Sequence, residues 1–353
     1  MKKNLNKLRT DIDNIDNKLL DLLSRRATVA QKVGKLKNDG IIYRPEREAQ
    51  VLSRLIKNNK GPLSNESITN IFNSIISNCR ALEKKLSVSF LGPLGTFSEE
   101  ATIQQFGENI ETVPTDSIDE VFNHVQSGVA HYGVVPVENS TEGTISRTLD
   151  LLLTKDLKIC GEIILPVHHF CLSKNNNLKK IKTIYAHGQS LAQCHDWLMS
   201  NLPDIKKIAV MSNAEGARLA SKEKNTAAIA SSRAADLFNL NVLYKNIEDE
   251  QSNSTRFLVL STEDVKPSSN DKTSIVVATK NKPGAIAELV APFAKNKVSM
   301  TKLESRPAKI GMWEYVFFID IEGHQTNNSV KTALKIIESK ASFMKILGSY
   351  PKN

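Results

Sequence analysis

Two polar side chains stand at the start of an apolar segment, in a place where they can act on a ligand. In NSTRFLVL, residues 253–260, Thr255 and Arg256 precede FLVL, whose composition predicts a strand buried on both faces. This pair suits a site for an anionic substrate, with the hydroxyl handling a proton. Asn, Ser and Thr are also common in turns, so a turn without chemistry is the alternative interpretation.

Two further segments place polar side chains directly after an apolar strand. FLGPLGTFSEEA, residues 90–101, puts Thr96 and Ser98 at the start of a predicted helix, where backbone N–H groups bind anions. Ordinary turn and helix-cap chemistry explains these two residues equally well. In VVPVENSTEGTI, residues 134–145, the strand is followed by Glu138, Asn139, Ser140 and Thr141. Because open α/β sheets bind ligands at the carboxyl ends of strands, these segments favour a ligand site.

Together these segments resemble prephenate dehydratase. The motifs GPLGTFS, VVPVENSTEG, YAHGQSLAQC and NSTRF occur in the order typical of that family, across about residues 88–262. The resemblance implies two α/β lobes around a cleft, similar to a periplasmic binding protein. It also implies loss of CO₂ and hydroxide from prephenate, which gives phenylpyruvate.

The same resemblance implies roles for individual residues. Thr255 would protonate the leaving hydroxyl, polarised by its neighbours because a free threonine is a poor acid. Arg256 would hold a carboxylate or orient the loop. Ala186 departs from the Ser that many family members carry. The implied prephenate-binding residues are Thr96, Ser98, Asn139, Ser140, Thr141, Gln193, Thr255, Arg256 and Phe257, with Glu138 and His187 nearby.

Cationic side chains recur at helical spacing near the N-terminus. Arg26 and Lys37 are eleven residues apart, which places them on one face of a long predicted helix, about 16 Å apart along its axis. Two long cationic side chains at this spacing can grip a small dianion. Arg9 lies too far along the same helix to reach that ligand, so an antiparallel partner chain would deliver it. A solvated charged face is the alternative.

Residues 4–86 resemble the all-helical type of chorismate mutase, through LRTDIDNIDNKLLDLLSRRATVAQKVGKLK followed by YRPEREAQVL. The resemblance implies an intertwined homodimer, or a higher homo-oligomer, that holds chorismate in helical pockets. Rearrangement of chorismate to prephenate needs a held conformer and charge placed against the breaking ether bond, and it needs no nucleophile. The implied chorismate-binding residues are Arg9, Arg26, Lys37, Arg47, Glu48 and Glu83, with Lys37 and Glu83 as catalytic groups.

Two positions depart from the mutase pattern. Glu83 stands where Gln is frequent, so its carboxyl group must be protonated to donate a hydrogen bond to the ether oxygen. We therefore expect mutase activity to fall as pH rises, and Glu83→Gln to flatten that profile. Arg44 stands where some members have an acidic residue, which leaves its role open.

The C-terminal segment contains a candidate amino-acid site. NKPGAIAELV (281–290) places a Pro-Gly turn before a helix, whose N–H groups suit a carboxylate, and LESRP (303–307) ends a strand. Both motifs resemble the ACT domain of the same enzyme family, which implies feedback inhibition by phenylalanine across a subunit contact. A passive dimerisation domain is the alternative. The implied phenylalanine site consists of Pro283, Gly284, Ala285, Ile286, Glu304, Ser305, Arg306 and Pro307.

The elements that must position these residues differ along the chain. Residues 1–86 predict three helices, over about 6–37, 46–58 and 67–85, as an all-α domain. Residues 87–264 alternate short apolar strands with helices, which predicts a two-lobed α/β domain with a mostly parallel sheet. The predicted strands cover residues 88–92, 131–137, 183–187, 227–230 and 256–260. A linker-like stretch at 265–273 precedes a βαββαβ pattern, which predicts an α+β ferredoxin-like domain over 272–353. The chain is thus expected to be multidomain.

Bulk composition excludes several classes of protein. The 353 residues are 40% apolar, with no run long enough to span a bilayer and no signal peptide at the N-terminus. The cysteines lack CxxC spacing, so we expect reduced thiols in a cytoplasmic protein without cofactor or metal, and structural roles for His168 and His169. The net charge of +9 comes with scattered lysines, so neither a nucleic-acid nor a membrane partner is expected. The cysteines are Cys79, Cys160, Cys171 and Cys194.

Two other functions compete with this interpretation of the sequence. A fusion of mutase and prephenate dehydrogenase would need a GxGxxG nicotinamide motif, which the sequence lacks. A ligand-responsive regulator would need a helix-turn-helix with a basic face, whereas the first predicted helix is one long rod. Retention on DNA at moderate salt would distinguish the regulator from the enzyme.

Overall fold

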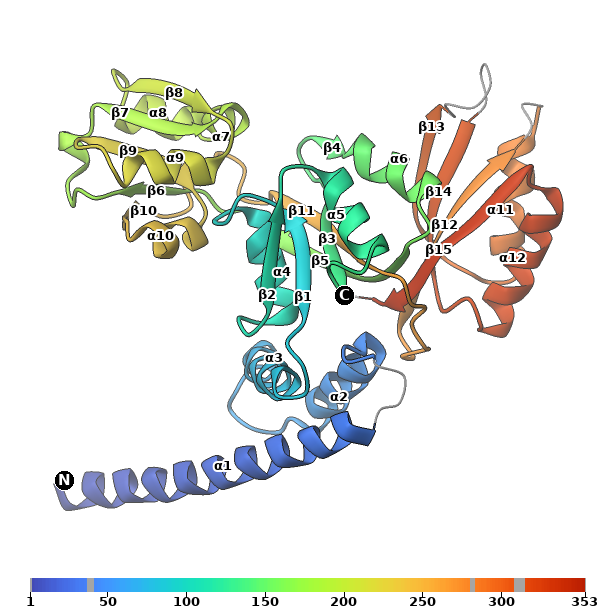
Figure 1. The fold of residues 1–353 in the computed structure, drawn as a ribbon, viewed down its shortest axis with the longest axis horizontal. Coiled ribbons are helices and arrows are strands. Elements are labelled where there is room, and N and C mark those ends of the chain that lie inside the picture. Colours follow the sequence, from blue (N-terminus) through green and yellow to red (C-terminus); the bar gives the residue numbers. More distant parts are fainter. Residues whose placement is uncertain (1, 37–40, 280–282, 308–314, 353) are drawn as a thin grey trace. The chain divides into compact units, whose positions relative to one another are not determined.

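The computed structural model describes residues 2–36, 41–279, 283–307 and 315–352 (Figure 1). The chain divides into two units. The helical unit consists of residues 1–86 with 106–111, and the second unit consists of residues 87–105 with 112–353.

The helical unit contains α1 (Lys2–Leu36), α2 (Pro45–Asn58) and α3 (Asn65–Ala81), which confirms the all-α prediction. Pro45 occupies the first turn of α2, where its missing N–H has no helical partner to lose. Ser64 caps α3 by accepting a hydrogen bond from the Ser67 amide at 3.1 Å. These local signals set the helix boundaries that the sequence predicted to within a few residues.

Helix α1 is one continuous rod with an exposed apolar stripe (Figure 1). Such a stripe on a helix normally packs against another surface. Its members are between 40% and 78% exposed, and they are Leu5, Leu8, Ile12, Ile15, Leu19, Leu20, Leu22, Leu23, Val29, Val33 and Leu36.

The first lobe of the second unit is built on a six-stranded sheet with the order β2-β1-β3-β11-β5, and β4 pairs with β3. Its helices are α4 (Phe97–Phe106), α5 (Ile118–Gln126) and α6 (Ser146–Thr154). The strands are β1 (Ser87–Leu91), β2 (Glu111–Thr115), β3 (Tyr132–Asn139), β4 (Gly143–Thr144), β5 (Lys158–Pro166) and β11 (Ser254–Ser261).

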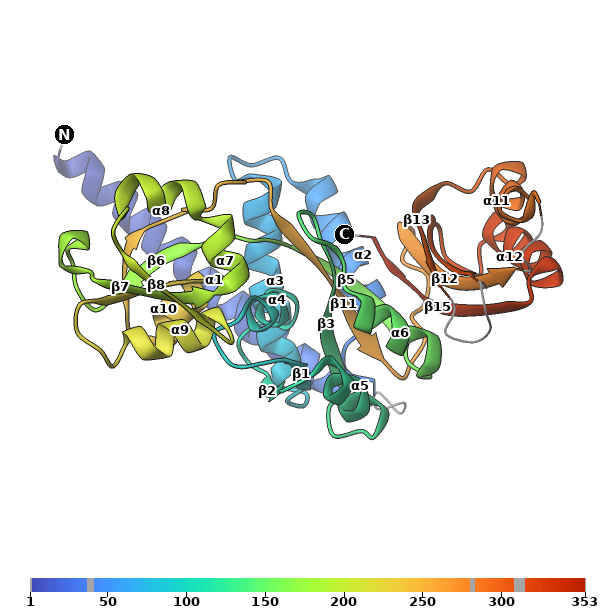
Figure 2. The same cartoon turned by 90° about the horizontal axis from the view of Figure 1, so that it is seen from above.

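The second lobe has a five-stranded sheet with the order β10-β6-β9-β7-β8. Helices α7 and α8 cover one face and α9 and α10 the other (Figure 2). Alternation along β9 explains this, because Ala227 and Ile229 pack with Leu198 of α8, while Ala228 and Ala230 pack with α9 and α10. The elements are β6 (Phe170–Ser173), the 3₁₀ helix η1 (Leu178–Lys180), β7 (Thr183–His187), α7 (Gly188–Gln193), α8 (His195–Asn201), β8 (Lys206–Val210), α9 (Asn213–Ala220), β9 (Thr226–Ala230), α10 (Ser232–Phe238) and β10 (Asn241–Tyr244).

The two sheets are mixed, so the prediction of a mostly parallel sheet was wrong. Strand β11 runs antiparallel to both β3 and β5, and β6 runs antiparallel to β9. The chain leaves the first lobe after β5 and returns only with β11. Strand β11 then crosses the first sheet in the direction opposite to that of β3 and β5. As a consequence Thr255, at the start of β11, pairs with Asn139, at the end of β3.

The C-terminal segment has the predicted βαββαβ order, with an antiparallel sheet arranged β13-β14-β12-β15. Helices α11 and α12 cover one face (Figure 2). The opposite face, including Val276 and Phe318, joins the core of the first lobe around Leu258. Gly348 permits this contact, because a Cβ there would lie 2.2 Å from the Ile159 carbonyl oxygen. The elements are β12 (Asp271–Thr279), α11 (Ala285–Lys295), β13 (Met300–Pro307), β14 (Tyr315–Glu322), α12 (Asn328–Lys340) and β15 (Phe343–Pro351).

Among the helices that the structure describes, none is long and apolar enough to cross a lipid bilayer.

Candidate active sites

A cavity of about 390 Å³ in the second unit is lined by residues of both lobes. It brings together side chains from the three polar motifs and from the α7 region. Of the residues expected to bind prephenate, those that line it are Thr96, Ser98, Asn139, Gln193, Thr255 and Phe257. His187, expected nearby, also lines it. Ser140, Thr141 and Arg256 are not among the lining residues.

The centre of the cavity is a hydrogen bond between Asn139 and Thr255. The Asn139 side chain donates through Nδ2 to Thr255 Oγ1 at 2.9 Å, and both residues are 9% exposed. The amide orientation is fixed, because Oδ1 accepts from the backbone amides of Thr141 at 3.0 Å and Glu142 at 3.2 Å. Since Thr255 Oγ1 accepts this bond, its own O–H proton is available to a ligand in the cavity.

Ser140 and Thr141 hold the Asn139 and Thr255 pair in place by hydrogen bonds. The Thr141 hydroxyl donates to Asn139 Oδ1 at 2.6 Å. Ser140 Oγ accepts from the Ser254 amide at 2.9 Å, which ties the end of β3 to the start of β11. The expectation that both residues contact substrate becomes an expectation that they hold Asn139 and Thr255 in place.

Arg256 lies on the other side of β11 from Thr255, because successive side chains of a strand point to opposite faces. Its guanidinium contacts Glu162 Oε2 and Asp320 Oδ2, each at 2.8 Å. The expectation that Arg256 holds a substrate carboxylate is therefore corrected, since these two acidic groups already occupy it on the face away from the cavity.

His169 also lines the cavity, although the sequence suggested a structural role for both histidines. Its Nε2 lies 3.0 Å from Gln193 Oε1, and its ring is 1% exposed. Burial lowers the pKa of His169, so the ring is neutral and donates through Nε2 to Gln193. The sequence signal was available, since His169 follows β5 at the crossing into the second lobe. His168 pairs with the buried Glu248 at 2.7 Å.

Most polar groups around the cavity are neutral, and Glu142 is an acidic member of the lining. Four helices begin at it, α4 with Thr96 and Ser98, α7 with His187, α9 with Ser212 and Asn213, and α10 with Ser231. Within the described parts of the chain, no Lys or Arg lines it. An anionic ligand would therefore be held by backbone N–H groups, hydroxyls and amides at helix N-termini rather than by cationic side chains.

The described residues contain no group of His, Cys, Asp and Glu suited to a metal ion. The four cysteines are free and buried. Burial raises the pKa of Cys171 to about 12, so this thiol stays protonated and unreactive.

A second cavity, of about 560 Å³, lies within the helical unit. Of the residues expected to bind chorismate, those that line it are Arg26, Arg47, Glu48 and Glu83. Arg44, whose role the sequence left open, lines it as well. Arg9 is exposed near the other end of α1, and Lys37 lies outside the described residues.

Arg80 is a lining residue that sequence reasoning missed. It is 5% exposed, and its guanidinium contacts Glu48 Oε1 at 2.5 Å and the Phe106 carbonyl oxygen at 2.8 Å. The Tyr43 ring stacks on it at 5.0 Å from the centroid. No sequence pattern marks Arg80, because its partners lie on α2 and beyond α3.

The Glu83 side chain rests against α1 at a glycine. A Cβ on Gly34 would lie 2.8 Å from Glu83 Cγ. Glycine at this position therefore leaves the space in which Glu83 reaches the cavity.

The C-terminal motif residues divide between two surroundings. Glu304 accepts a hydrogen bond from Thr144, and Arg306 donates to the Ser146 carbonyl oxygen at 2.8 Å, so both face the first lobe. Ser305 is exposed on the other side of β13. Gly284 begins α11 with a φ of +82°, a conformation that glycine adopts freely. Of its neighbours in the motif, Pro283 and Ile286 are exposed, Ala285 is buried and Pro307 ends β13.

Family models match three consecutive segments of the chain. They are chorismate mutase type II over residues 8–84, prephenate dehydratase over residues 88–265 and the ACT domain over residues 273–339.

Relatives match this chain over almost their whole length. A protein of Pseudomonas aeruginosa named bifunctional chorismate mutase/prephenate dehydratase is 47% identical over 356 residues, covering 99% of this chain and 98% of its own length. A protein of the same name from Neisseria gonorrhoeae is 47% identical over 346 residues, covering 97% and 96%. The crystal structure of prephenate dehydratase from Arthrobacter aurescens in complex with L-Phe superposes with a TM-score of 0.70 at 32% identity, covering 76% of this chain and 90% of that one. The chain therefore belongs to the bifunctional chorismate mutase/prephenate dehydratase family.

Proposed function

We propose that the helical cavity rearranges chorismate to prephenate and that the cavity of the second unit converts prephenate to phenylpyruvate. The family makes the chain an enzyme with both kinds of catalytic segment. Phenylalanine, bound to the dehydratase structure from Arthrobacter aurescens, is the proposed inhibitor acting through the ACT segment.

The observation that carries the dehydratase assignment is the hydrogen bond from Asn139 to Thr255. Because Thr255 Oγ1 accepts this bond, the Thr255 hydroxyl proton is available to the ligand. The hydrogen bond donated to Oγ1 also makes that proton more acidic. In the reaction the Thr255 proton joins the departing ring hydroxyl as water. The C–C bond to the ring carboxylate breaks to release CO₂, and its electron pair completes the aromatic ring. Solvent returns the proton to Thr255.

Substrate carboxylates would bind at the N-termini of α4 and α9. Thr96 and Ser98 serve one end of the cavity and Asn213 the other. Gln193, held by the neutral His169, would position the enolpyruvyl side of prephenate. Because no Lys or Arg is among the described residues that line the cavity, the carboxylate lost as CO₂ can leave without breaking an ion pair.

The mutase assignment rests on the cationic lining of the helical cavity. Among the described residues that line it, Arg26, Arg44 and Arg47 suit the two carboxylates of chorismate, while Arg80 is held by Glu48. Because the rearrangement transfers no proton, holding the reactive conformer supplies most of the catalysis. Arg9 from a second copy of the chain, with Lys37 and Glu83, would complete the pocket.

The exposed stripe of α1 supports a homodimer. A helix with so many exposed apolar side chains buries them most simply against the same helix of a second copy. The four buried free thiols fit a reducing compartment, which supports the cytoplasm as the location.

Thr255→Ala tests the dehydratase assignment. We expect phenylpyruvate formation from prephenate to fall by about 10²-fold to 10⁴-fold, the contribution typical of a proton donor, while chorismate consumption is unchanged. Thr332→Ala on α12, which removes an exposed hydroxyl, is the matched control. Full dehydratase turnover in Thr255→Ala would show the assignment to be wrong.

Adding phenylalanine to the wild-type assay tests the regulatory assignment. We expect phenylalanine to suppress phenylpyruvate formation. Turnover that phenylalanine leaves unchanged, together with no binding heat in calorimetry, would restrict the ACT segment to a structural role.

A further inference from the structure

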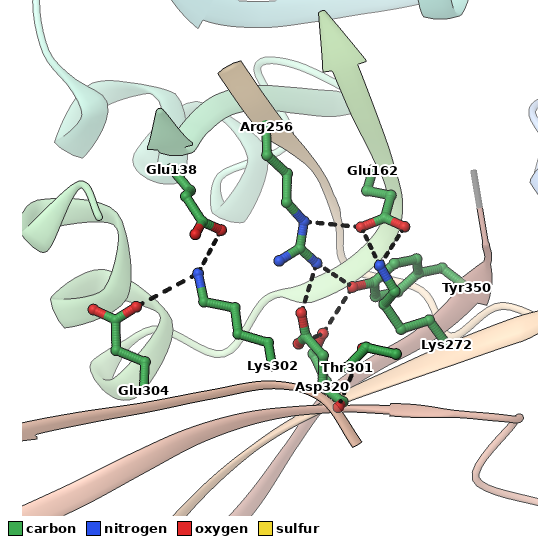
Figure 3. A network of polar contacts seen from close by, with 10 residues as sticks. Glu138, Glu162, Arg256, Lys272, Thr301, Lys302, Glu304, Asp320 and Tyr350 are labelled. Atoms are coloured by element: carbon green, nitrogen blue, oxygen red, sulfur yellow. Dashed lines mark hydrogen bonds and ion pairs between the residues drawn. The ribbon is translucent and has the colours of Figure 1, made fainter. Parts of the chain in front are cut away.

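The two residues at the centre of the dehydratase cavity have neighbours that point to the opposite face of the sheet. Thr255 pairs with Asn139 across β11 and β3, and the next pair in the same register is Arg256 with Glu138. Because side chains alternate along a strand, Arg256 and Glu138 lie back to back with the catalytic pair. Figure 3 shows both directed toward side chains of the C-terminal sheet.

Arg256 is held by a buried network from the C-terminal sheet and from β5. Its guanidinium contacts Asp320 at 2.8 Å and the Tyr350 hydroxyl at 3.1 Å, in addition to Glu162 at 2.8 Å. Lys272 contacts Glu162 at 2.6 Å. Four of these five side chains come from β11, β14, β15 and β12, so the network joins the strand that begins with Thr255 to three strands of the ACT segment (Figure 3).

Glu138 is held by β13. Lys302 Nζ lies 2.7 Å from Glu138 Oε2 and 3.5 Å from Glu304 Oε2 (Figure 3). Glu304 accepts a hydrogen bond from Thr144, which lines the dehydratase cavity. Strand β13 therefore reaches the cavity by two short routes, through Glu138 to Asn139 and through Glu304 to Thr144.

Arg256 and Tyr350 have fixed charge states in this network. Burial alone lowers the pKa of Arg256, but the neighbouring Asp320 and Glu162 outweigh it and raise that pKa. Burial raises the pKa of Tyr350, so its hydroxyl stays neutral. Removing one partner from such a network leaves an uncompensated buried charge, which moves the remaining groups.

We propose that Lys302 and Asp320 are positioning residues of the dehydratase site, holding Glu138 and Arg256 so that Asn139 and Thr255 keep their hydrogen bond. This inference rests on the proposed catalytic role of that pair. Because Lys302 and Glu304 belong to β13, any displacement of β13 by an effector is passed through Glu138 to Asn139 and through Glu304 to Thr144. The ACT sheet is thus part of the structure that makes the site active.

Lys302→Met and Asp320→Asn test the proposal, since each removes a charge and keeps the shape of the side chain. We expect either change to lower dehydratase kcat by about tenfold or more, as misplacement of reacting groups does, with a smaller effect on KM. Mutase activity of the same preparations stays at the wild-type level. The matched controls are Lys352→Met and Glu322→Gln, which break an ion pair of 2.6 Å elsewhere on the same sheet.

Two further measurements separate positioning from general destabilisation. Lys302→Arg, which keeps the positive charge beside Glu138 and Glu304, is expected to retain most of the kcat that Lys302→Met loses. Hydrogen exchange of the amides at the start of β11 is expected to accelerate in Lys302→Met and in Asp320→Asn, and to stay unchanged in the controls.

The exchange measurement does not depend on turnover, so the two proposals fail in different ways. If amide exchange accelerates in Lys302→Met and Asp320→Asn but Thr255→Ala keeps full dehydratase activity, the link between the ACT sheet and β11 is supported. The catalytic role of Thr255 is then rejected. Wild-type kcat and wild-type exchange at β11 in both Lys302→Met and Asp320→Asn would overturn the positioning proposal.

Discussion

At the scale of single residues, the direction of one amide decides whether Thr255 can donate a proton. Asn139 presents its NH₂ group to Thr255 because backbone amides of Thr141 and Glu142 occupy its oxygen. A carboxylate in the same place can only accept hydrogen bonds. It would therefore accept one from the Thr255 hydroxyl and keep that proton from the ligand.

Asn139→Asp is therefore expected to lower dehydratase kcat by about 10²-fold or more, although the side chain keeps its size. The new negative charge would also repel prephenate, so KM rises as well. Steady-state kinetics on prephenate measures both effects, with chorismate consumption as the internal control. Retention of more than half the wild-type kcat would mean that the Thr255 proton is not oriented by Asn139.

Glu100 is a buried carboxyl group that the proposed mechanism does not use. Within the described structure its Oε2 is buried without a hydrogen-bond partner. Burial raises the pKa of Glu100, against smaller opposite contributions from His168 and Arg233. When the pKa of a group is higher in the folded state than in the unfolded state, the group contributes stability that is fully present below the unfolded pKa. That contribution is lost as pH rises through the folded pKa.

Glu100→Gln imitates the protonated acid at every pH. We expect the variant to be more stable than the wild type at pH 7, and the difference to shrink toward pH 4.5, the ordinary value from which this pKa is raised. Thermal melts of both proteins at several pH values measure the difference. A stability difference that is the same at pH 4.5 and pH 7 would show that Glu100 does not titrate abnormally.

At the scale of elements, one glycine links the geometry of α1 to the mutase cavity. Gly34 is in helical conformation, so alanine there favours the helix by about 1 kcal/mol. The added methyl group would lie 2.8 Å from Glu83 Cγ and must displace that side chain.

Gly34→Ala is thus expected to reduce mutase kcat clearly while the melting temperature of the helical unit stays the same or rises. Circular dichroism melts and chorismate consumption test the two halves of this expectation. Dehydratase activity is the control. Loss of stability in parallel with loss of mutase activity would point to general disruption instead of displacement of Glu83.

In the two lobes, the strands that the sequence predicted share one property, which is burial. Strands β1, β3, β7, β9 and β11 are runs of apolar residues and were found from composition alone. Of the strands of these lobes that were missed, β2, β8 and β10 are partly exposed at sheet edges, whereas β5 and β6 are largely buried. An edge strand carries polar residues on its exposed side, so its composition resembles that of a loop.

The candidate sites divide in a similar way. Thr255 and Asn139 were found because each lies at one end of an apolar strand, and the structure brings them together across β3 and β11. The surroundings of Arg256 and Arg80 were not predictable, because both depend on partners from elements distant in sequence, Asp320 for the one and Glu48 for the other. Residue types show which chemistry a side chain can perform. The face of the strand or helix on which the side chain lies decides which cavity it enters.

At the scale of the whole molecule, we expect the mutase pocket to depend on assembly. The dehydratase cavity gathers side chains of all three polar motifs, Thr96, Asn139 and Thr255 among them, within one unit of the chain. The helical cavity holds Arg26 on α1, while Arg9 lies too far along the same helix to serve it. If two copies pair along the stripe of α1, each mutase pocket combines Arg26 of one copy with Arg9 of the other.

Mixing two inactive variants tests this arrangement directly. Arg9→Ala and Arg26→Ala are each expected to lack mutase activity alone, because every pocket of either homodimer lacks one arginine. After unfolding and refolding together in equal amounts, half of the dimers are mixed, and each mixed dimer has one pocket with both arginines. Mutase activity should therefore return to about a quarter of the wild-type value, while dehydratase activity is unchanged throughout. A mixture as inactive as its components, in which capture through a tag on only one variant confirms mixed dimers, would mean that Arg9 does not cross to the partner's pocket.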